Sequence, residues 1–225
     1  MLKWIALILM LVDHYAYIMI DFISKDTYIV MRLLGRLSFP IFAYYVVLGV
    51  GRTSRLKTYM TRLLLFAIIS EAVIRMLGLF THSYVNIIFS LFLYAAAAIC
   101  IENKVNMSKI IRIVLFMGVI LLIPFVEYGY SGFLVFLSLP FVHKKISNDK
   151  QYIYASILIT LSFLPEIILF SGPQIQWFAG FAGLLMFNEK MDKRVFSPMI
   201  EKWTFYIAYP VQWFIFAAIY ILLLK

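Results

Sequence analysis

The sequence predicts an all-α integral membrane protein, a polytopic transmembrane helical bundle of about nine spans in a single domain over residues 1–225. The composition carries this prediction, because 64% of the residues are hydrophobic, only 14% are charged and the mean hydropathy is +0.95. Several long runs are left without a charge, which is typical of helices that cross a bilayer. A second observation, the placement of the basic residues, predicts how these runs are oriented.

Nine apolar runs follow one another along the chain. A transmembrane helix needs about 20 predominantly apolar residues, and most of the runs approach that length. Runs 130–143 and 173–188 are shorter, so we expect them to be tilted or buried within the bundle. The expected spans are 4–23, 28–50, 59–80, 84–102, 108–126, 130–143, 152–171, 173–188 and 203–224.

The basic residues are distributed unevenly about these runs. With the N-terminus inside, fifteen lysines and arginines fall in cytoplasmic segments and only two, Lys25 and Lys225, on the opposite side. This positive-inside pattern predicts an N-terminus inside, a C-terminus outside and an odd number of spans. Because the basic residues lie in short loops, the net charge of +9 argues for a bilayer and against a nucleic-acid partner.

Few residues are available for a metal site. Cys100 is the single cysteine, which excludes an internal disulfide and any multi-cysteine metal site. The three histidines lie far apart in the sequence, and the chain has no P-loop, no GxGxxG and no HExxH motif. We therefore expect no metal.

Asp13 and His14 lie in the middle of the first run, the stretch that organises the rest of the chain. Ten helical residues beyond Lys3, Asp13 is expected about 15 Å deep, near the middle of a hydrocarbon layer roughly 30 Å thick. Each such group costs on the order of 3 kcal/mol to insert alone, so both should face protein or water, and a functional site is the first hypothesis. His14 is the best candidate general base, and a packing histidine is the alternative.

Consecutive helix residues point about 100° apart, so Asp13 and His14 should have different neighbours. Arg36, in the second run, is expected at the depth of Asp13 and is the obvious partner for its carboxylate. Such a pair can serve a site or only fix the helix register. Arg32 lies one turn nearer the outside, where it can snorkel to the interface or line the mouth of a cavity.

The third and fourth runs carry further polar groups. Glu71 and Arg75 are spaced i,i+4 and can pair on one helix face, which has a purely structural explanation. Asn86 and Ser90 offer polar groups near the outer half. The cytoplasmic segment before the third run can hold the phosphates of an anionic cofactor or serve only as a topology signal. Its basic residues are Arg52, Arg55, Lys57 and Arg62.

Several segments in this order resemble the TraX-like family of integral membrane proteins, named for the conjugation protein that acetylates the pilin N-terminus. The matching pieces are LKWIALILMLVDH at 2–14, MRLLGRLSFPIFAYYVVLG at 31–49, YMTRLLLFAIISE at 59–71, NIIFSL at 86–91, YGYSG at 128–132 and FYIAYP at 205–210. The family is similar to the wider transmembrane acyltransferases, which use a first-span histidine, and Lys3-x10-His14 resembles their basic-x10-His pattern.

The resemblance implies acetyl transfer from cytoplasmic acetyl-CoA to an acceptor at the outer face of the bacterial cytoplasmic membrane. A peptide or protein N-terminus is the first acceptor that we expect, and a sugar hydroxyl is the second. By motif, the implied site includes Asp13, His14, Arg32, Arg36, Phe39 and Pro40, and less securely Asn86, Tyr209 and Pro210. Many relatives read Tyr-Pro-x-His in the last span, whereas Gln212 takes the place of that histidine here. Gln212 cannot accept a proton at neutral pH, so the acceptor or the rate is expected to differ.

We therefore interpret the chain as a membrane acetyl-CoA-dependent acetyltransferase. The expected catalytic residues are His14, Asp13 and Arg36. The residues expected to bind the donor are Arg32, Asn86, Arg52, Arg55, Arg62 and Tyr209. Two other functions stay open at this point, a small transporter or proton-coupled carrier and a non-catalytic partner of a secretion or conjugation system.

Overall fold

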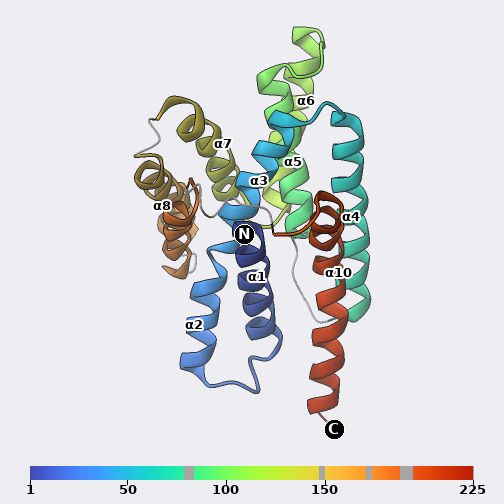
Figure 1. Ribbon diagram of the computed structural model, residues 1–225, viewed down its shortest axis with the longest axis vertical. Coiled ribbons are helices and arrows are strands. Elements are labelled where there is room, and N and C mark those ends of the chain that lie inside the picture. The colour runs from blue at the N-terminus through green and yellow to red at the C-terminus, as the bar shows by residue number, and fades with distance from the viewer. Residues whose placement is uncertain (79–83, 147–149, 171–173, 188–194, 225) are drawn as a thin grey trace.

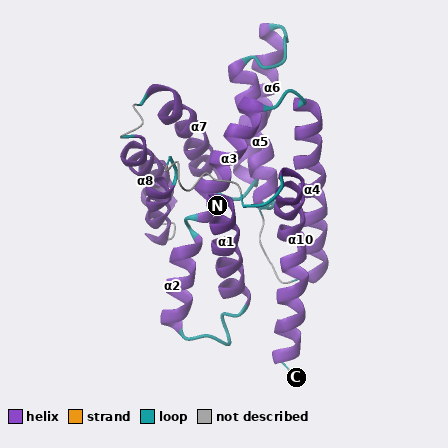
Figure 2. Ribbon diagram, viewed as in Figure 1, coloured by secondary structure: helices purple, strands orange, loops and turns teal. Residues whose placement is uncertain are grey.

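The computed structural model describes residues 1–78, 84–146, 150–170, 174–187 and 195–224. Helices make up almost all of these ranges, as Figures 1 and 2 show, and the all-α prediction is confirmed for them. The β-structure within these ranges is an isolated parallel bridge between Val85 and Val126. Every predicted apolar run contains at least one helix.

Chain order sets the labels of the elements. They are α1 (Leu2–Ile18), α2 (Lys25–Gly35), α3 (Ser38–Arg52), α4 (Leu56–Leu77), α5 (Ile87–Glu102), α6 (Lys109–Leu122), η1 (Ile123–Phe125), α7 (Gly129–Lys145), α8 (Gln151–Phe170), η2 (Gln174–Phe181), α9 (Ala182–Leu185) and α10 (Pro198–Leu223).

The run expected as one span at 28–50 contains two helices, α2 and α3, which meet at residues 36 and 37 and lie within one segment long and apolar enough to cross a bilayer. Pro40 explains the break, because it has no N–H to donate to the carbonyl of Arg36 and its ring would clash with that carbonyl in a continuous helix. Ser38 instead donates its hydroxyl to the carbonyl of Gly35 at 2.8 Å. The break therefore lies in the middle of the run, at the level of the polar residues that the sequence placed there.

Side-chain caps fix where several helices begin. The hydroxyls of Ser24, Ser108 and Ser197 accept the backbone N–H three residues on, at 3.2, 3.4 and 3.4 Å, at the starts of α2, α6 and α10. Each cap pairs one of the backbone donors that a helix start leaves free. The starts of these helices are therefore set by the sequence close to their own ends.

Helix α1 lies at the centre of the helices that form the site. It packs against α2, α3 and α10, while α4 packs against α10 and α5 (Figure 1). The first and last helices of the chain are thus neighbours. On the other side of α3, helix α7 packs against both α3 and α8.

The distribution of apolar and charged side chains is that of a membrane protein. Helix α6 has no buried residue and exposes large apolar side chains along its length, including Ile110, Val114 and Leu121. Asp13 and Arg36, by contrast, are buried. Two described segments, Lys25–Arg52 and Pro198–Leu223, are long and apolar enough to cross a bilayer. The nine-span topology and the sidedness of the termini stay predictions.

Candidate functional site

A cavity of about 650 Å³ lies between α1, α3, α4 and α10. Along α1 its lining extends from Lys3 to Tyr17, a distance of about 21 Å at the helical rise. Asp13, His14 and Arg36 all line it, so the structure brings the three expected catalytic residues to one space. Arg32, Arg62, Asn86 and Tyr209 line it as well. Arg52 and Arg55, at the exposed end of α3 and start of α4, do not.

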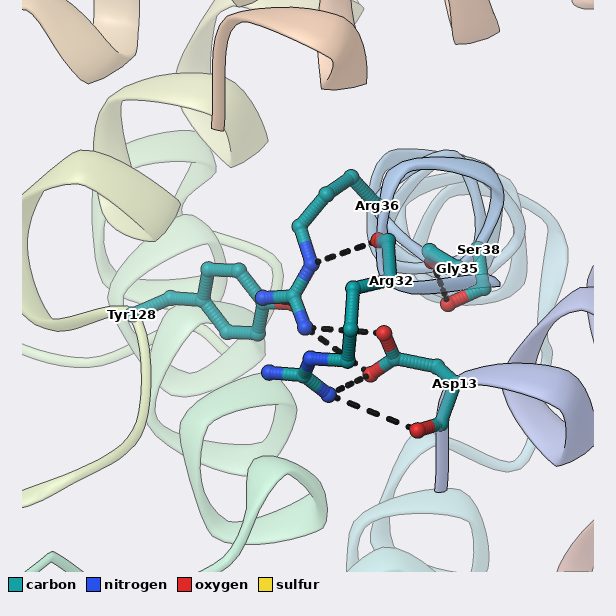
Figure 3. Close-up of polar contacts among 6 residues, drawn as sticks. All are labelled: Asp13, Arg32, Gly35, Arg36, Ser38 and Tyr128. Carbon is teal, nitrogen blue, oxygen red and sulfur yellow. Dashed lines mark hydrogen bonds and ion pairs between the residues drawn. The ribbon is translucent and has the colours of Figure 1, made fainter. Parts of the chain in front are cut away.

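Asp13 binds both arginines of the second run. Arg36 Nη2 lies 2.9 Å from each carboxylate oxygen, and Arg32 Nη1 lies 2.7 Å from Oδ2 (Figure 3). The Asp13–Arg36 contact expected from the sequence is therefore present, and Arg32 joins it as a second partner. The Asp13 side chain is 10% exposed and that of Arg36 is 8% exposed. With both oxygens occupied, this carboxylate is held as an acceptor and is poorly placed to take a proton from a substrate.

Contacts with neighbouring segments hold Asp13 and Arg36 in place. A Cβ at Gly35 would overlap the side chain of Asp13, so a glycine is required where α2 meets α1. Arg36 donates Nε to the carbonyl of Arg32 at 3.3 Å and Nη1 to the hydroxyl of Tyr128 at 3.4 Å, as Figure 3 shows. Three segments, α1, the end of α2 and the residue before α7, thus meet at the guanidinium of Arg36.

His14 lies in aromatic surroundings. Its ring is stacked on Trp213 of α10, with centroids 4.4 Å apart and planes 29° apart, and it meets Tyr209 edge-on at 5.6 Å. Its Nδ1 is buried and forms no hydrogen bond to a described residue. An imidazole held by ring stacking with an uncommitted nitrogen can accept a proton.

Gln212 is the polar neighbour of His14. It is 2% exposed and lies close enough to His14 to interact with its imidazole. Neither of its amide atoms has a hydrogen-bond partner of good geometry among the described residues. A buried amide without such bonds costs free energy, so this pair is a candidate for function.

Asn86 has a structural role in the cavity wall. Its Oδ1 accepts the N–H of Ile88 at 3.0 Å and caps α5, and its Nδ2 donates to Ala67 O and to Glu71 Oε2, both at 2.9 Å. Glu71 also pairs with Arg75 at 2.7 Å, as the i,i+4 spacing predicts. The Asn86 amide is fully committed in these bonds, so its geometry favours joining α4 to α5 over binding a donor.

Three cations line the end of the cavity at which α1 and α10 begin: Lys3, Arg62 and Lys202. Arg62 stacks over the ring of Tyr206 at 5.9 Å, and its Nε is buried with no hydrogen bond to a described residue. Neither Arg62 nor Lys202 forms an ion pair within the described ranges. Such a set of cations from α1, α4 and α10 is suited to an anionic group.

Sequence reasoning gave no role to Trp213, Lys202, Glu127 or Tyr128, all of which line the cavity. Trp213 lies four residues after Tyr209, so helical spacing could have placed it on the same face. Tyr128 and Gly129 lie in the segment YGYSG, in which the glycines favour an irregular backbone. Nothing in the sequence could have placed Lys202 opposite Lys3, because that proximity depends on how α10 packs on α1.

Comparison with protein families gives one result that covers almost the whole chain. The model of the family described as TraX protein matches residues 1–220. The chain therefore belongs to the TraX family, as its motifs predicted. No curated protein and no solved structure matches it.

Proposed function

We propose that this TraX family member is an acetyl-CoA-dependent acetyltransferase of the bacterial cytoplasmic membrane. It would move an acetyl group from cytoplasmic acetyl-CoA to the N-terminus of a peptide or protein, or to a sugar hydroxyl, at the outer face. One observation carries the proposal: His14 lies in a cavity with three cations about 16 Å away along α1 and with open space continuing past it to Tyr17. The family membership supports it, because the family is named for pilin acetylation.

His14 acts as the general base in this reaction. The acceptor amine or hydroxyl attacks the thioester carbonyl, and the imidazole takes the proton that the acceptor loses. The C–S bond of the tetrahedral intermediate then breaks, and the imidazolium gives its proton to the leaving thiolate of CoA. The acetylated acceptor and CoA are formed, and His14 returns to its neutral state.

Asp13 and Arg36 support this step as positioning residues. Their charges are committed to one another and to Arg32, so they hold α1 against the α2–α3 break and fix the helix that carries His14. Fixing the base relative to a bound donor lowers the entropy cost of reaching the transition state. The same commitment argues against a proton relay through Asp13, which the carrier hypothesis requires.

The anionic end of the donor is assigned to Lys3, Arg62 and Lys202. Phosphate groups bind well to converging cations, and a long donor then places its thioester deeper in the cavity, near His14. Arg62 keeps the donor role that the sequence suggested. Arg52 and Arg55 lie away from the cavity and act in this proposal only as topology signals.

The test uses the purified protein in liposomes with acetyl-labelled acetyl-CoA. Binding and slow hydrolysis of acetyl-CoA, both dependent on Lys3, Arg62 and Lys202, are expected. Mass spectrometry of surface peptides and glycans from cells with and without the protein should reveal a product heavier by one acetyl group. Solute flux without any use of acetyl-CoA would show that the protein is a carrier and not an acetyltransferase.

The predicted topology has its own test. A reporter fused after Lys225 should be active only on the outer side.

A further inference from the structure

Glu127 is a cavity carboxylate that the proposed mechanism does not use. Its side chain lines the same space as His14. Within the described ranges the acidic partners of ion pairs are Asp13, Glu71 and Glu102, and no lysine or arginine lies within ion-pair distance of Glu127. The Glu127 carboxylate is partly exposed in the cavity and accepts the backbone N–H of Ile87, but no cation is paired with it, so it is able to bind one.

The backbone around Glu127 is held from both sides. Its N–H donates to the carbonyl of Val85 at 3.0 Å, and its own carbonyl accepts the hydroxyls of Ser90 at 2.7 Å and Tyr94 at 3.3 Å. This segment connects η1 to α7 and is clamped against the start of α5. The position of the carboxylate is therefore set by the tertiary structure and not by a flexible loop.

The residue that follows is in a rarely occupied conformation. Tyr128 has a φ of +61°, in the left-handed region, where a bulky side chain is strained. Its ring is stacked on Phe39 with centroids 4.1 Å apart, and its hydroxyl accepts from Arg36. Strain that the surroundings over-determine in this way is typical of functional sites.

The charged groups around Glu127 sum to +1, and none of the cations among them forms an ion pair with its carboxylate. Asp13 (−1) with Arg32 and Arg36 (+2) sums to +1, and the Glu71–Arg75 pair sums to zero. Glu127 (−1) offsets the remaining positive charge at long range while keeping its own oxygens free of a paired cation. The titratable groups that act on it, or on which it acts, come from α1, the α2–α3 break, α4, the Tyr128 turn and α10: Asp13, Tyr17, Arg36, Glu71, Tyr128 and Tyr209.

We propose that Glu127 receives the ammonium group of an acceptor N-terminus in this cavity and takes its first proton. This inference rests on the proposed acetyltransferase function. The cationic amine gives one proton to the Glu127 carboxylate and becomes a free amine, which attacks the thioester. The second proton passes through His14 to the CoA thiolate as the C–S bond breaks. The proton on Glu127 then leaves to water, so the reaction releases one proton overall.

Two proton acceptors are needed for an amine and only one for a hydroxyl. An α-amino group has a pKa of about 8, so at neutral pH about nine tenths of it is protonated and cannot attack. A sugar hydroxyl is neutral, and His14 alone would serve it. Glu127 thus distinguishes between the two acceptor classes. Tyr209 contacts His14 and interacts electrostatically with Glu127.

The experiment measures acetylation of a pool of lysine-free peptides with free N-termini by the purified wild-type protein and by Glu127→Gln. At about pH 7 the variant should lose about tenfold in kcat/KM for the peptides, because it can use only the small fraction of peptide whose amine is already deprotonated. At about pH 9 most of the amine is already free, so the variant should recover to near the wild-type rate. Binding of acetyl-CoA should be unchanged at both pH values.

The matched control is Glu102→Gln at the other end of α5, where the carboxylate lies 3.8 Å from Lys104 and outside the cavity, and it should behave as the wild type does. Glu127→Asp keeps the charge on a shorter arm and should retain more activity at neutral pH than Glu127→Gln. It also tests the proposal if the glutamine variant does not fold.

Three results would overturn the assignment of Glu127. These are wild-type kcat/KM in Glu127→Gln at neutral pH, an equal loss at both pH values, and equal losses in the Gln and Asp variants. A wild-type protein that binds acetyl-CoA but acetylates no peptide in the pool also overturns it, while leaving an acetyltransferase with a hydroxyl acceptor. A wild-type protein that neither binds nor consumes acetyl-CoA removes the proposed function as well.

Discussion

Asp13 and His14 follow one another on α1, yet their side chains lie in two different surroundings. Asp13 accepts three hydrogen bonds from two arginines and has no free oxygen. His14 stacks on Trp213, and its buried Nδ1 has no hydrogen bond within the described residues. The difference arises because neighbouring helix residues point about 100° apart, so one faces the α2–α3 break and the other faces α10.

This comparison separates two tasks that a buried acid and a buried imidazole are often assumed to share. The Asp13 side of α1 neutralises charge and joins helices, whereas the His14 side is left able to exchange a proton. Substitutions on the two sides should therefore fail in different ways. The first should remove stability, and the second should remove turnover.

The largest effect is expected for His14→Asn. Asparagine keeps similar bulk and some hydrogen bonding but cannot accept the proton, so turnover should fall by a factor on the order of 10² to 10⁴. The melting temperature in detergent should change little, because the stacking on Trp213 contributes only part of the packing of α1. Wild-type turnover in this variant, or loss of fold and turnover together, would make His14 a packing residue.

Asp13→Asn should mainly lower stability. It leaves the buried Arg36 and the partly buried Arg32 without their counter-charge, which costs on the order of 3 kcal/mol or more. Thermal unfolding should show the loss, and the double variant with Arg36→Gln should restore part of it. Because two arginines share the carboxylate, the restoration should stay incomplete unless Arg32 is neutralised too. A variant with unchanged stability and lost turnover would reverse the comparison.

The cations proposed to bind acetyl-CoA test the His14 side of the comparison, because the donor has to reach His14. Neutralising Arg62 and Lys202 together should weaken acetyl-CoA binding by about tenfold or more, since a hydrogen bond to a charged group contributes about 1.5–3 kcal/mol. Neutralising Arg52 and Arg55 is the matched control and should leave binding unchanged. Equilibrium binding of labelled acetyl-CoA measures both, and equal effects would remove the cavity cations from the donor site.

The smallest effect on stability is expected for Gln212→Leu. Replacing a buried amide that lacks good partners by an apolar group of similar size should change the free energy of unfolding by less than about 1 kcal/mol, or increase it. Turnover should fall a few-fold, because His14 loses the side-chain amide that interacts with it from α10. Loss of stability with unchanged turnover would place Gln212 on the structural side of the comparison.

The sequence by itself determined the helices, the family and the common level of Asp13 and Arg36 along their helices. Apolar runs and caps are local properties, so each run contains a helix, and counting residues from the ends of runs placed Asp13 and Arg36 at one level. The i,i+4 spacing likewise predicted the Glu71–Arg75 pair. These features depend only on distances along the sequence and on the fixed rise per residue of a helix.

Only the tertiary structure decided which faces meet. Pro40 could be read from the sequence, but the break at Arg36 and its contact with Tyr128 depend on how α2, α3 and α7 pack. Arg52 and Arg62 were equal candidates for the donor, and only Arg62 faces the cavity, together with Lys202 from the far end of the chain. The physical reason is that the rotation of each helix about its axis is set by all its neighbours at once, and no local pattern records it.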